Sequence, residues 1–120
     1  MQLFLLSEDD NITCLACEGK IMQSMLLPDS DPLEDLLGGE GFTQQVLLDL
    51  ERTDYLDSSG IGWLVGLHRR FVTAGGKLIL HSVPPMVEQV IHLLNLHHLL
   101  TIKPDQPAAL ALAKQAKGQA

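Results

Sequence analysis

Apolar residues at the start of the chain fall into two short runs, residues 3–7 and residues 12–17, with the polar residues 8–11 between them. Two such runs joined by a polar connection are typical of an antiparallel hairpin. A cluster of turn-forming residues follows at 28–31, where Asp31 is a good cap for a helix with Pro32 at its first position. We expect that helix to cover residues 32–37 and to end at Gly38-Gly39.

The rest of the chain alternates between aliphatic runs and amphipathic segments. Residues 46–50 are almost continuously aliphatic, as expected of a strand buried on both faces. The remaining predicted elements are a helix over 58–74 that ends at Gly75-Gly76, a strand over 77–83, a helix over 84–96, a short edge strand over 97–103 and a helix over 106–120. This alternation predicts an α/β fold in which helices pack on a mixed, α+β type of sheet.

Composition adds limits on size and partners. The 120 residues are 46% hydrophobic and only 4% aromatic, which predicts one domain, residues 1–120, around an aliphatic core. The formal net charge of -7 argues against nucleic acid as a partner, because phosphate recognition needs basic patches. No apolar run approaches the roughly 18 residues of a membrane span, and the acidic N-terminus is unlike a signal peptide. We therefore expect a cytoplasmic protein with no direct membrane insertion.

Cys14 and Cys17 form a Cys-x-x-Cys pattern, which can serve as a redox pair or as half of a metal site. Their neighbours alternate as in a strand, however, and strand residues an odd number apart point to opposite faces. We expect both cysteines to be buried as small hydrophobic residues. The histidines, among them His92 and His97-His98, do not converge at the spacing of metal ligands, so no metal site and no cofactor are predicted.

The helix that follows Ser59 has two distinct sides when it is projected at about 100° per residue. Gly62 and Gly66 fall on the outward side, and Trp63 falls at the boundary. A glycine inside a helix costs about 1 kcal/mol relative to alanine, so either both glycines are merely tolerated or something packs closely there, with Trp63 as an anchor. The arc expected to face the sheet consists of Ile61, Leu64, Val65, Leu67, His68, Phe71 and Val72, with His68 as a hydrogen-bonded core residue.

Ser58 and Ser59 precede that helix and have three interpretations. With Asp57 they are good helix caps. A nucleophilic serine is disfavoured, because the Gly-x-Ser-x-Gly elbow and an activating histidine–acid pair are both missing. A modified serine has a sound physical basis, because the N-terminus of a helix tolerates a phosphate. That phosphate would add a charge of about -1.5 to -2, which repels a partner docked over it.

The second half of the chain resembles a known protein family. The segment VLLDLERTDYLDSSGIGWLVGLHRRFVTAGGKLILHSVPPMVEQVIHLLNLHHLLTI resembles a STAS domain, and specifically the bacterial anti-sigma-factor antagonists. The likeness lies in the order of an aliphatic strand, Asp-Ser-Ser-Gly, a glycine-containing helix, Gly-Gly-Lys-Leu-Ile-Leu and a helix that begins with proline. It covers 57 of the 120 residues, a little under half of the chain. It implies a STAS-like mixed sheet of four to five strands with flanking helices.

The resemblance also implies a regulatory phosphoprotein that is not an enzyme. In that family the unphosphorylated protein binds an anti-sigma factor that is also a serine kinase, which frees the sigma factor for transcription. Phosphorylation by this kinase ends the complex, and a PP2C-type phosphatase restores it. Carried over to this chain, the resemblance implies Ser58 as phosphoacceptor, Asp57, Ser59 and Gly60 as the turn around it, and Gly62, Trp63 and Gly66 as the exposed partner-binding face.

The first half of the chain departs from the family pattern. The acidic residue that family members carry after the second strand is missing from Gly19-Lys20-Ile21-Met22, and the stretch from Pro28 to Phe42 interrupts the helix that usually follows. Two alternatives therefore stay open. One is a STAS scaffold subunit of a transporter or signalling complex that is never phosphorylated. The other is an enzyme that uses Ser58 or Ser59 as nucleophile.

Overall fold

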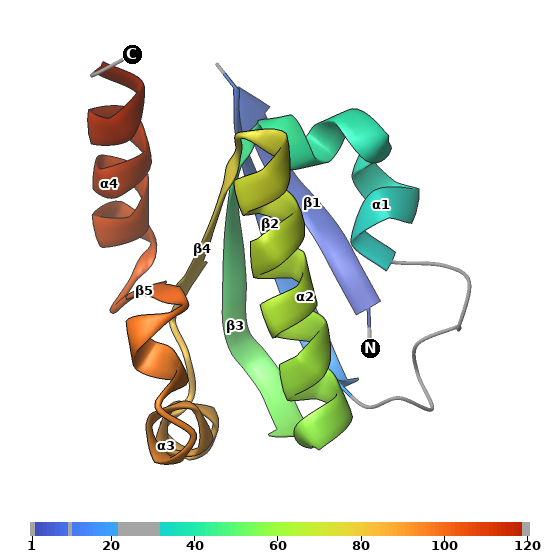
Figure 1. Ribbon diagram of the computed structural model, residues 1–120, viewed down its shortest axis with the longest axis vertical. Coiled ribbons are helices and arrows are strands. Elements are labelled where there is room, and N and C mark those ends of the chain that lie inside the picture. Colours follow the sequence, from blue (N-terminus) through green and yellow to red (C-terminus); the bar gives the residue numbers. More distant parts are fainter. Residues whose placement is uncertain (1, 10, 22–31, 119–120) are drawn as a thin grey trace.

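The computed structural model describes residues 2–9, 11–21 and 32–118 (Figure 1). The strands are β1 (Gln2–Asp9), β2 (Ile12–Ile21), β3 (Gln45–Leu56), β4 (Lys77–His81) and β5 (Thr101–Lys103). The α-helices are α1 (Pro32–Leu37), α2 (Ser58–Ala74), α3 (Pro85–Leu93) and α4 (Gln106–Gly118). Two short 3-10 helices, η2 (Gly39–Thr43) and η3 (Leu96–His98), complete the described elements.

The five strands form a single mixed sheet in the order β1-β2-β3-β4-β5, which is also their order along the chain. β1 and β2 form the predicted antiparallel hairpin, while β2, β3, β4 and β5 run parallel to one another. Each parallel pair is joined by a connection that contains a helix, as crossover connections require. The predicted alternation of strands and helices and the mixed sheet are therefore confirmed.

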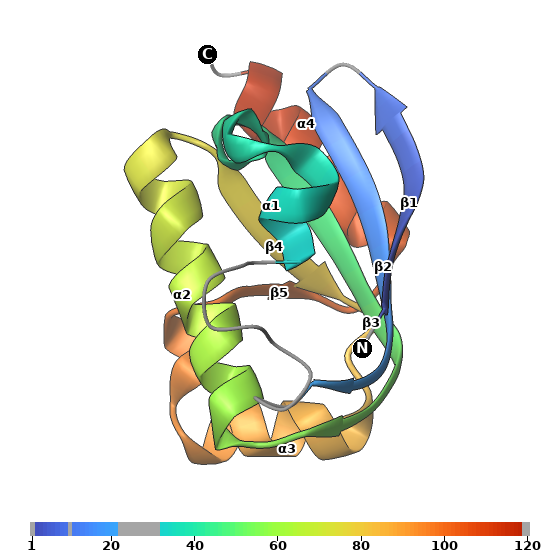
Figure 2. The same ribbon diagram turned by 90° about the vertical axis from the view of Figure 1, so that its right-hand side faces the viewer.

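Helices cover the two faces of the sheet unequally (Figures 1 and 2). α1 and α2 lie on one face, and α4 lies on the other. The larger hydrophobic core joins the sheet to α2 and includes Leu64, Leu67 and Phe71. The smaller core lies between the sheet and α4, where Ala109 and Ala113 are fully buried.

The aliphatic run in β3 feeds both cores, which is the predicted behaviour of a strand buried on both faces. Val46, Leu48 and Leu50 belong to the larger core, and Leu47 belongs to the smaller one. Further along, β3 is exposed at residues 51–52 and 54–55, whereas Thr53 and Leu56 stay buried. The second half of β3 is therefore covered only in part, and its end still contributes Leu56 to the larger core.

The Gly75-Gly76 stop of α2 has a separate reason at each position. Gly75 is the C-cap of α2 and has a left-handed backbone conformation with a positive φ of 90°, which glycine adopts without strain. Gly76 allows a close approach of two main chains, because a Cβ there would lie 2.3 Å from the carbonyl oxygens of both Phe42 and Gln44. Gly76 thus allows the turn after α2 to pack directly against the main chain before β3.

Several predicted boundaries and one predicted orientation are wrong. The helix predicted over 84–96 ends at Leu93, since Asn95 adopts a positive φ of 58°. Residues 97 and 98 then belong to η3, so the edge strand predicted over 97–103 begins only at Thr101. The strand predicted over 77–83 ends at His81, before the positive φ of 56° at Ser82. Val72 is 62% exposed instead of facing the sheet, because it lies about 100° round the helix from buried Phe71.

Candidate functional site

The turn that starts α2 is held together by the side chain of Asp57. This residue is the N-cap of the helix and has an extended backbone. One of its carboxylate oxygens accepts a hydrogen bond from the backbone N–H of Gly60 at 2.9 Å and another from the hydroxyl of Ser59 at 2.5 Å. The hydrogen bond from Ser59, followed by that from Gly60, lowers the pKa of Asp57 below its usual value. Asp57 is therefore an ionised cap over the positive end of the helix dipole.

Ser58 is the first residue of α2, directly after this cap. Its side chain lies outside the part of the structure that is described. Its backbone position is in the first turn, where helix N–H groups lack partners within the helix and favour a negative group. Met22 and residues 28–31, which the sequence singled out, also lie outside the described residues.

The outward side of α2 carries the two glycines that the projection placed there. Gly62 is exposed and Gly66 is half-buried. A Cβ built on either would meet no atom of the described chain within 4 Å outside its own stretch of helix. Neither glycine is therefore needed for packing among the described residues, unlike Gly76.

Trp63 does not lie fully on that exposed face. It is half-buried and packs against the larger core. Its indole nitrogen is enclosed and has no hydrogen-bond partner among the described residues. We call the side of α2 that carries Gly62 and Gly66 the glycine face. The Trp63 ring borders this face, and its packing against the core limits how far the ring can extend toward a partner.

The second half of α2 contacts the segment before β3 through an arrangement that the sequence did not predict. The guanidinium of Arg70 lies 3.9 Å from the centre of the Phe42 ring and 3.0 Å from a carboxylate oxygen of Glu34. The Phe42 ring in turn meets Phe71 edge-on at 5.0 Å. These contacts join α1 and η2 to α2, although the residues lie far apart in the sequence. His68, predicted as a core histidine, is half-buried on the same helix.

Three histidine rings, those of His92, His97 and His98, lie next to one another at the end of α3. The rings of His92 and His97 are stacked with their centres 4.2 Å apart, and those of His97 and His98 are 4.0 Å apart. The early end of α3 at Leu93 causes this, because η3 turns the chain back along the helix. Even so, no group of His, Cys, Asp or Glu within the described ranges is arranged to hold a metal ion.

The two cysteines are free and buried on opposite faces of β2, as predicted. Cys14 belongs to the smaller core and Cys17 to the larger one. Burial raises the pKa of the Cys17 thiol to about 11, against a smaller opposing effect of the nearby Thr53 hydroxyl. A thiol with so high a pKa is a poor nucleophile at neutral pH.

Within the described part of the chain, no helix is both long and apolar enough to cross a membrane.

The chain is similar to a known protein family and to several solved structures. Residues 6–109 match the family model described as the STAS domain. A Thermotoga maritima protein described as a candidate anti-sigma factor antagonist shares 22% identity over 94% of this chain and 93% of its own, with a TM-score of 0.74. The anti-sigma factor antagonist SpoIIAA in its unphosphorylated form shares 18% identity over 89% of this chain and 92% of its own, with a TM-score of 0.63.

A transporter relative has the same fold. A sulfate transporter family protein from Wolinella succinogenes shares 14% identity over 88% of this chain and 86% of its own, with a TM-score of 0.66. At these low identities the solved structures establish a common fold, a five-stranded mixed sheet with flanking helices. Which partner the fold serves has to be argued from the site.

Proposed function

Because this chain belongs to the STAS domain family, we propose that it is an anti-sigma-factor antagonist, a regulatory protein without catalysis of its own that works in the cytoplasm by partner switching. Its proposed partners are an anti-sigma factor that is also a serine kinase, and a PP2C-type phosphatase. The likeness to the Thermotoga maritima protein and to SpoIIAA supports this proposal.

The single observation that carries the proposal is the bare face beside the start of α2. Gly62 and Gly66 leave open space above the helix, one turn apart. Together they cost the helix about 2 kcal/mol relative to alanine, and no contact among the described residues compensates for that cost. A partner whose backbone or side chains approach α2 closely gives both glycines a purpose. Trp63, at the border, adds an apolar edge to this face.

Ser58 is the proposed phosphoacceptor. The hydroxyl of Ser59 donates to the Asp57 carboxylate, so a phosphate on Ser59 would replace that hydrogen bond with repulsion between two anions. Ser58 immediately follows the cap and belongs to the first helical turn, where the helix dipole stabilises negative charge. Asp57, Ser59 and Gly60 then serve as the turn that presents Ser58.

The proposed switch is a change of charge on a fixed surface. The kinase transfers the γ-phosphoryl group of ATP to the Ser58 hydroxyl, which loses its proton, and ADP leaves. The added charge of about -1.5 to -2 lies beside the glycine face and opposes a partner docked there. A penalty of about 1.4 kcal/mol already weakens binding tenfold. Hydrolysis by the phosphatase restores the neutral hydroxyl and with it the binding surface.

Intact-mass measurement tests the acceptor. The chain is incubated with ATP and the anti-sigma serine kinases of the organism that encodes it. A mass increase of one phosphate is expected for the wild type and for Ser59→Ala, and none is expected for Ser58→Ala. Ser58→Asp should keep the fold and bind the kinase at least tenfold more weakly. If Ser58→Asp binds as tightly as the wild type, the charge switch is wrong.

A second candidate is an unphosphorylated STAS scaffold in a transporter or signalling complex, which the likeness to the Wolinella succinogenes protein favours. The absence of a carboxylate in residues 19–22 agrees with it. Co-purification with a membrane complex, together with no phosphate added by any of the kinases, would select this candidate. Labelling of Ser58 or Ser59 by a fluorophosphonate would instead support the third alternative, an enzyme.

A further inference from the structure

Among the described residues, only α4 covers the sheet face opposite α2, and it covers about half of it. Along β2, Cys14 is buried under α4, whereas Ala16, the next residue on the same face, is partly exposed. Along β3, Leu47 is buried, Asp49 is partly exposed and Glu51 is exposed. The cover that α4 provides therefore stops midway along both strands.

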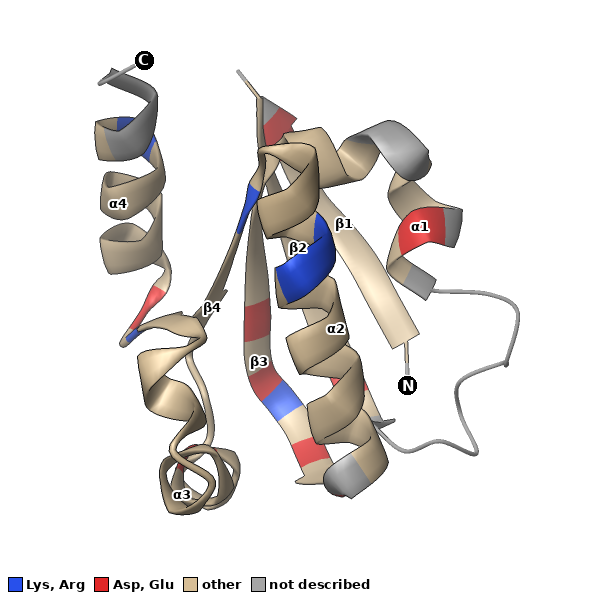
Figure 3. Ribbon diagram, in the orientation of Figure 1, with Lys and Arg blue, Asp and Glu red and all other residues tan. Residues whose placement is uncertain are grey.

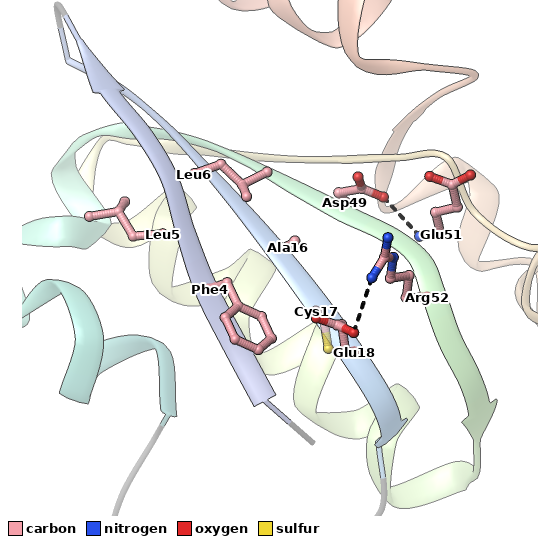
Figure 4. Close-up of a pocket in the computed structure, with 9 residues that line it drawn as sticks. All are labelled: Phe4, Leu5, Leu6, Ala16, Cys17, Glu18, Asp49, Glu51 and Arg52. Carbon is pink, nitrogen blue, oxygen red and sulfur yellow. Dashed lines mark hydrogen bonds and ion pairs between the residues drawn. The ribbon is translucent and has the colours of Figure 1, made fainter.

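The uncovered part is hollowed and has an apolar side. A hollow of about 500 Å³ lies across β1, β2 and β3 (Figure 4). On β1 it is lined by Phe4 and Leu6, which are 40% and 54% exposed, and on β2 by Ala16. We use the name open sheet face for Phe4, Leu6, Ala16, Glu18, Asp49 and Glu51.

The other side of the open sheet face is acidic. Figure 3 shows the acidic residues that follow one another along β3, with one basic residue among them. Glu18, Asp49 and Glu51 line the hollow, and the one cation among its described lining residues is Arg52, whose guanidinium lies 3.6 Å from Glu18. His81, opposite Asp49 on β4, is almost fully buried. Burial lowers the pKa of its ring, which disfavours the imidazolium that would otherwise face Asp49.

A helix is the element that fits this place. Parallel strands such as β2 and β3 are normally covered by helices on both faces, and α4 already occupies the adjoining half of this face. A second helix alongside α4 would continue the layer. A second copy of this chain fits poorly, because each copy has a net charge of -7 and would bring a further acidic face.

We propose that the open sheet face binds an amphipathic helix of a partner protein, whose apolar side chains pack on Phe4, Leu6 and Ala16 and whose Lys or Arg side chains face Asp49, Glu51 and Glu18. This surface lies on the opposite side of the sheet from α2 (Figure 2). The helix can therefore be bound whether or not a kinase occupies the glycine face, and the inference does not depend on the phosphoserine switch.

The probe for the test is a synthetic leucine–lysine peptide that forms one apolar and one basic helical side. A scrambled peptide of the same composition serves as control, because it has the same charge but no continuous apolar side. Amide chemical shifts of the labelled full chain should move, with saturation, at Phe4, Leu6, Ala16, Asp49 and Glu51. The scrambled peptide should bind at least tenfold more weakly.

Matched variants separate this surface from other exposed groups. The pairs Phe4→Ser with Leu6→Ser, and Asp49→Asn with Glu51→Gln, should each weaken binding at least tenfold. Leu93→Ser with Leu94→Ser makes the same kind of change at exposed positions of 74% and 54% elsewhere, and Glu88→Gln removes an exposed carboxylate on α3. These controls should leave binding within twofold of the wild type, and thermal unfolding of every variant confirms that it is folded.

Three outcomes would overturn the proposal. The first is a set of shifts centred on α2 or α3, and the second is equal binding of the two peptides. The third is a dimer of the free chain, seen by light scattering, that Phe4→Ser with Leu6→Ser dissociates. That result would make a second copy the occupant.

Discussion

Gly62 and Gly66 lie one helical turn apart on the outward side of α2, and at each of them a Cβ would project into open space. Glycine in a helix is normally explained by a close neighbour or by a positive φ. Neither applies here, since both residues are helical and the described chain places nothing over them. The pair therefore has an energetic cost that folding does not recover.

Alanine at either position should separate stability from binding. We expect Gly62→Ala and Gly66→Ala each to raise the free energy of unfolding by about 0.5–1 kcal/mol, because alanine restricts the unfolded chain and meets no clash. Affinity for the partner kinase should fall at least tenfold. Urea unfolding and calorimetric titration measure the two effects. A stabilised variant that still binds with wild-type affinity would show that the glycines are merely tolerated.

The same substitution at Gly76 should have the opposite effect on stability. A Cβ at this position would lie 2.3 Å from two main-chain carbonyl oxygens, which cannot yield as a flexible side chain would. We expect Gly76→Ala to lower the free energy of unfolding by about 1–3 kcal/mol, measured by urea unfolding. Gly66→Ala is the matched control in open space. If both variants are equally stable, the close approach of the two main chains is not a constraint.

The cap at Asp57 should matter for stability in a pH-dependent way. Replacing Asp57 with alanine removes the acceptor for Ser59 and Gly60 and should lower the free energy of unfolding at pH 7. The pKa of Asp57 is lowered in the folded chain, so its contribution is complete above the unfolded value near 3.8 and is lost as the pH falls through the lower folded value.

Urea unfolding at pH 7 and at pH 3 measures this difference between wild type and Asp57→Ala. The gap between the two proteins should narrow in acid. Asp54→Ala, at an exposed position of β3, is the control and should leave stability nearly unchanged at both values of pH. A gap that stays constant down to acid pH would mean that the ionised carboxylate is not what stabilises the helix.

The sequence predicts the local features of this structure well. The hairpin, the strand at Val46–Leu50 and the stop at Gly75 follow from periodicity and from single-residue chemistry, and all three are present. The division of Cys14 and Cys17 between two cores follows from strand geometry alone. The glycine face of α2 was likewise predicted by projecting one helix.

Features that depend on contacts between distant segments were missed. The end of α3 at Leu93 depends on the backbone of Asn95, so the stacking of His92 on His97 had no signal in their spacing. The contact of Arg70 with Phe42 depends on where η2 packs against α2, which no local pattern indicates. The open sheet face could not be foreseen either, because it depends on where α4 stops covering the sheet.

The stacked histidines predict a loss of stability in weak acid. His97 is half-buried between His92 and His98, and its Nδ1 is enclosed without a hydrogen-bond partner among the described residues. Burial, followed by the proximity of His98 and then of His92, lowers the pKa of His97 below its usual value of 6.5. A carboxylate oxygen of Glu88 lies 3.7 Å from Nε2 of His92, on the outer ring of the stack.

The direction in which pH changes the free energy of unfolding follows from how many protons each state binds. Between the unfolded value near 6.5 and the lower folded value, the unfolded chain holds more protons on His97 than the folded chain does. Stability is therefore complete above pH 6.5 and falls as the pH drops through this window. His81 contributes in the same direction, because burial lowers its pKa too. The test is the difference in unfolding free energy between pH 7.5 and pH 5.5, which should be smaller in His97→Gln than in the wild type.

Titration of the ring protons by NMR supplies the site-specific measurement. The His97 ring should titrate with a midpoint below 6.5 in the folded chain, and the midpoint should rise in His98→Gln, which removes the second cause of the shift. Protonation should also perturb the amides of α3 and η3 first, because the stacked rings hold these two elements together. A His97 midpoint at or above 6.5 would contradict the argument, since the folded chain would then favour the charged ring and acid would stabilise it.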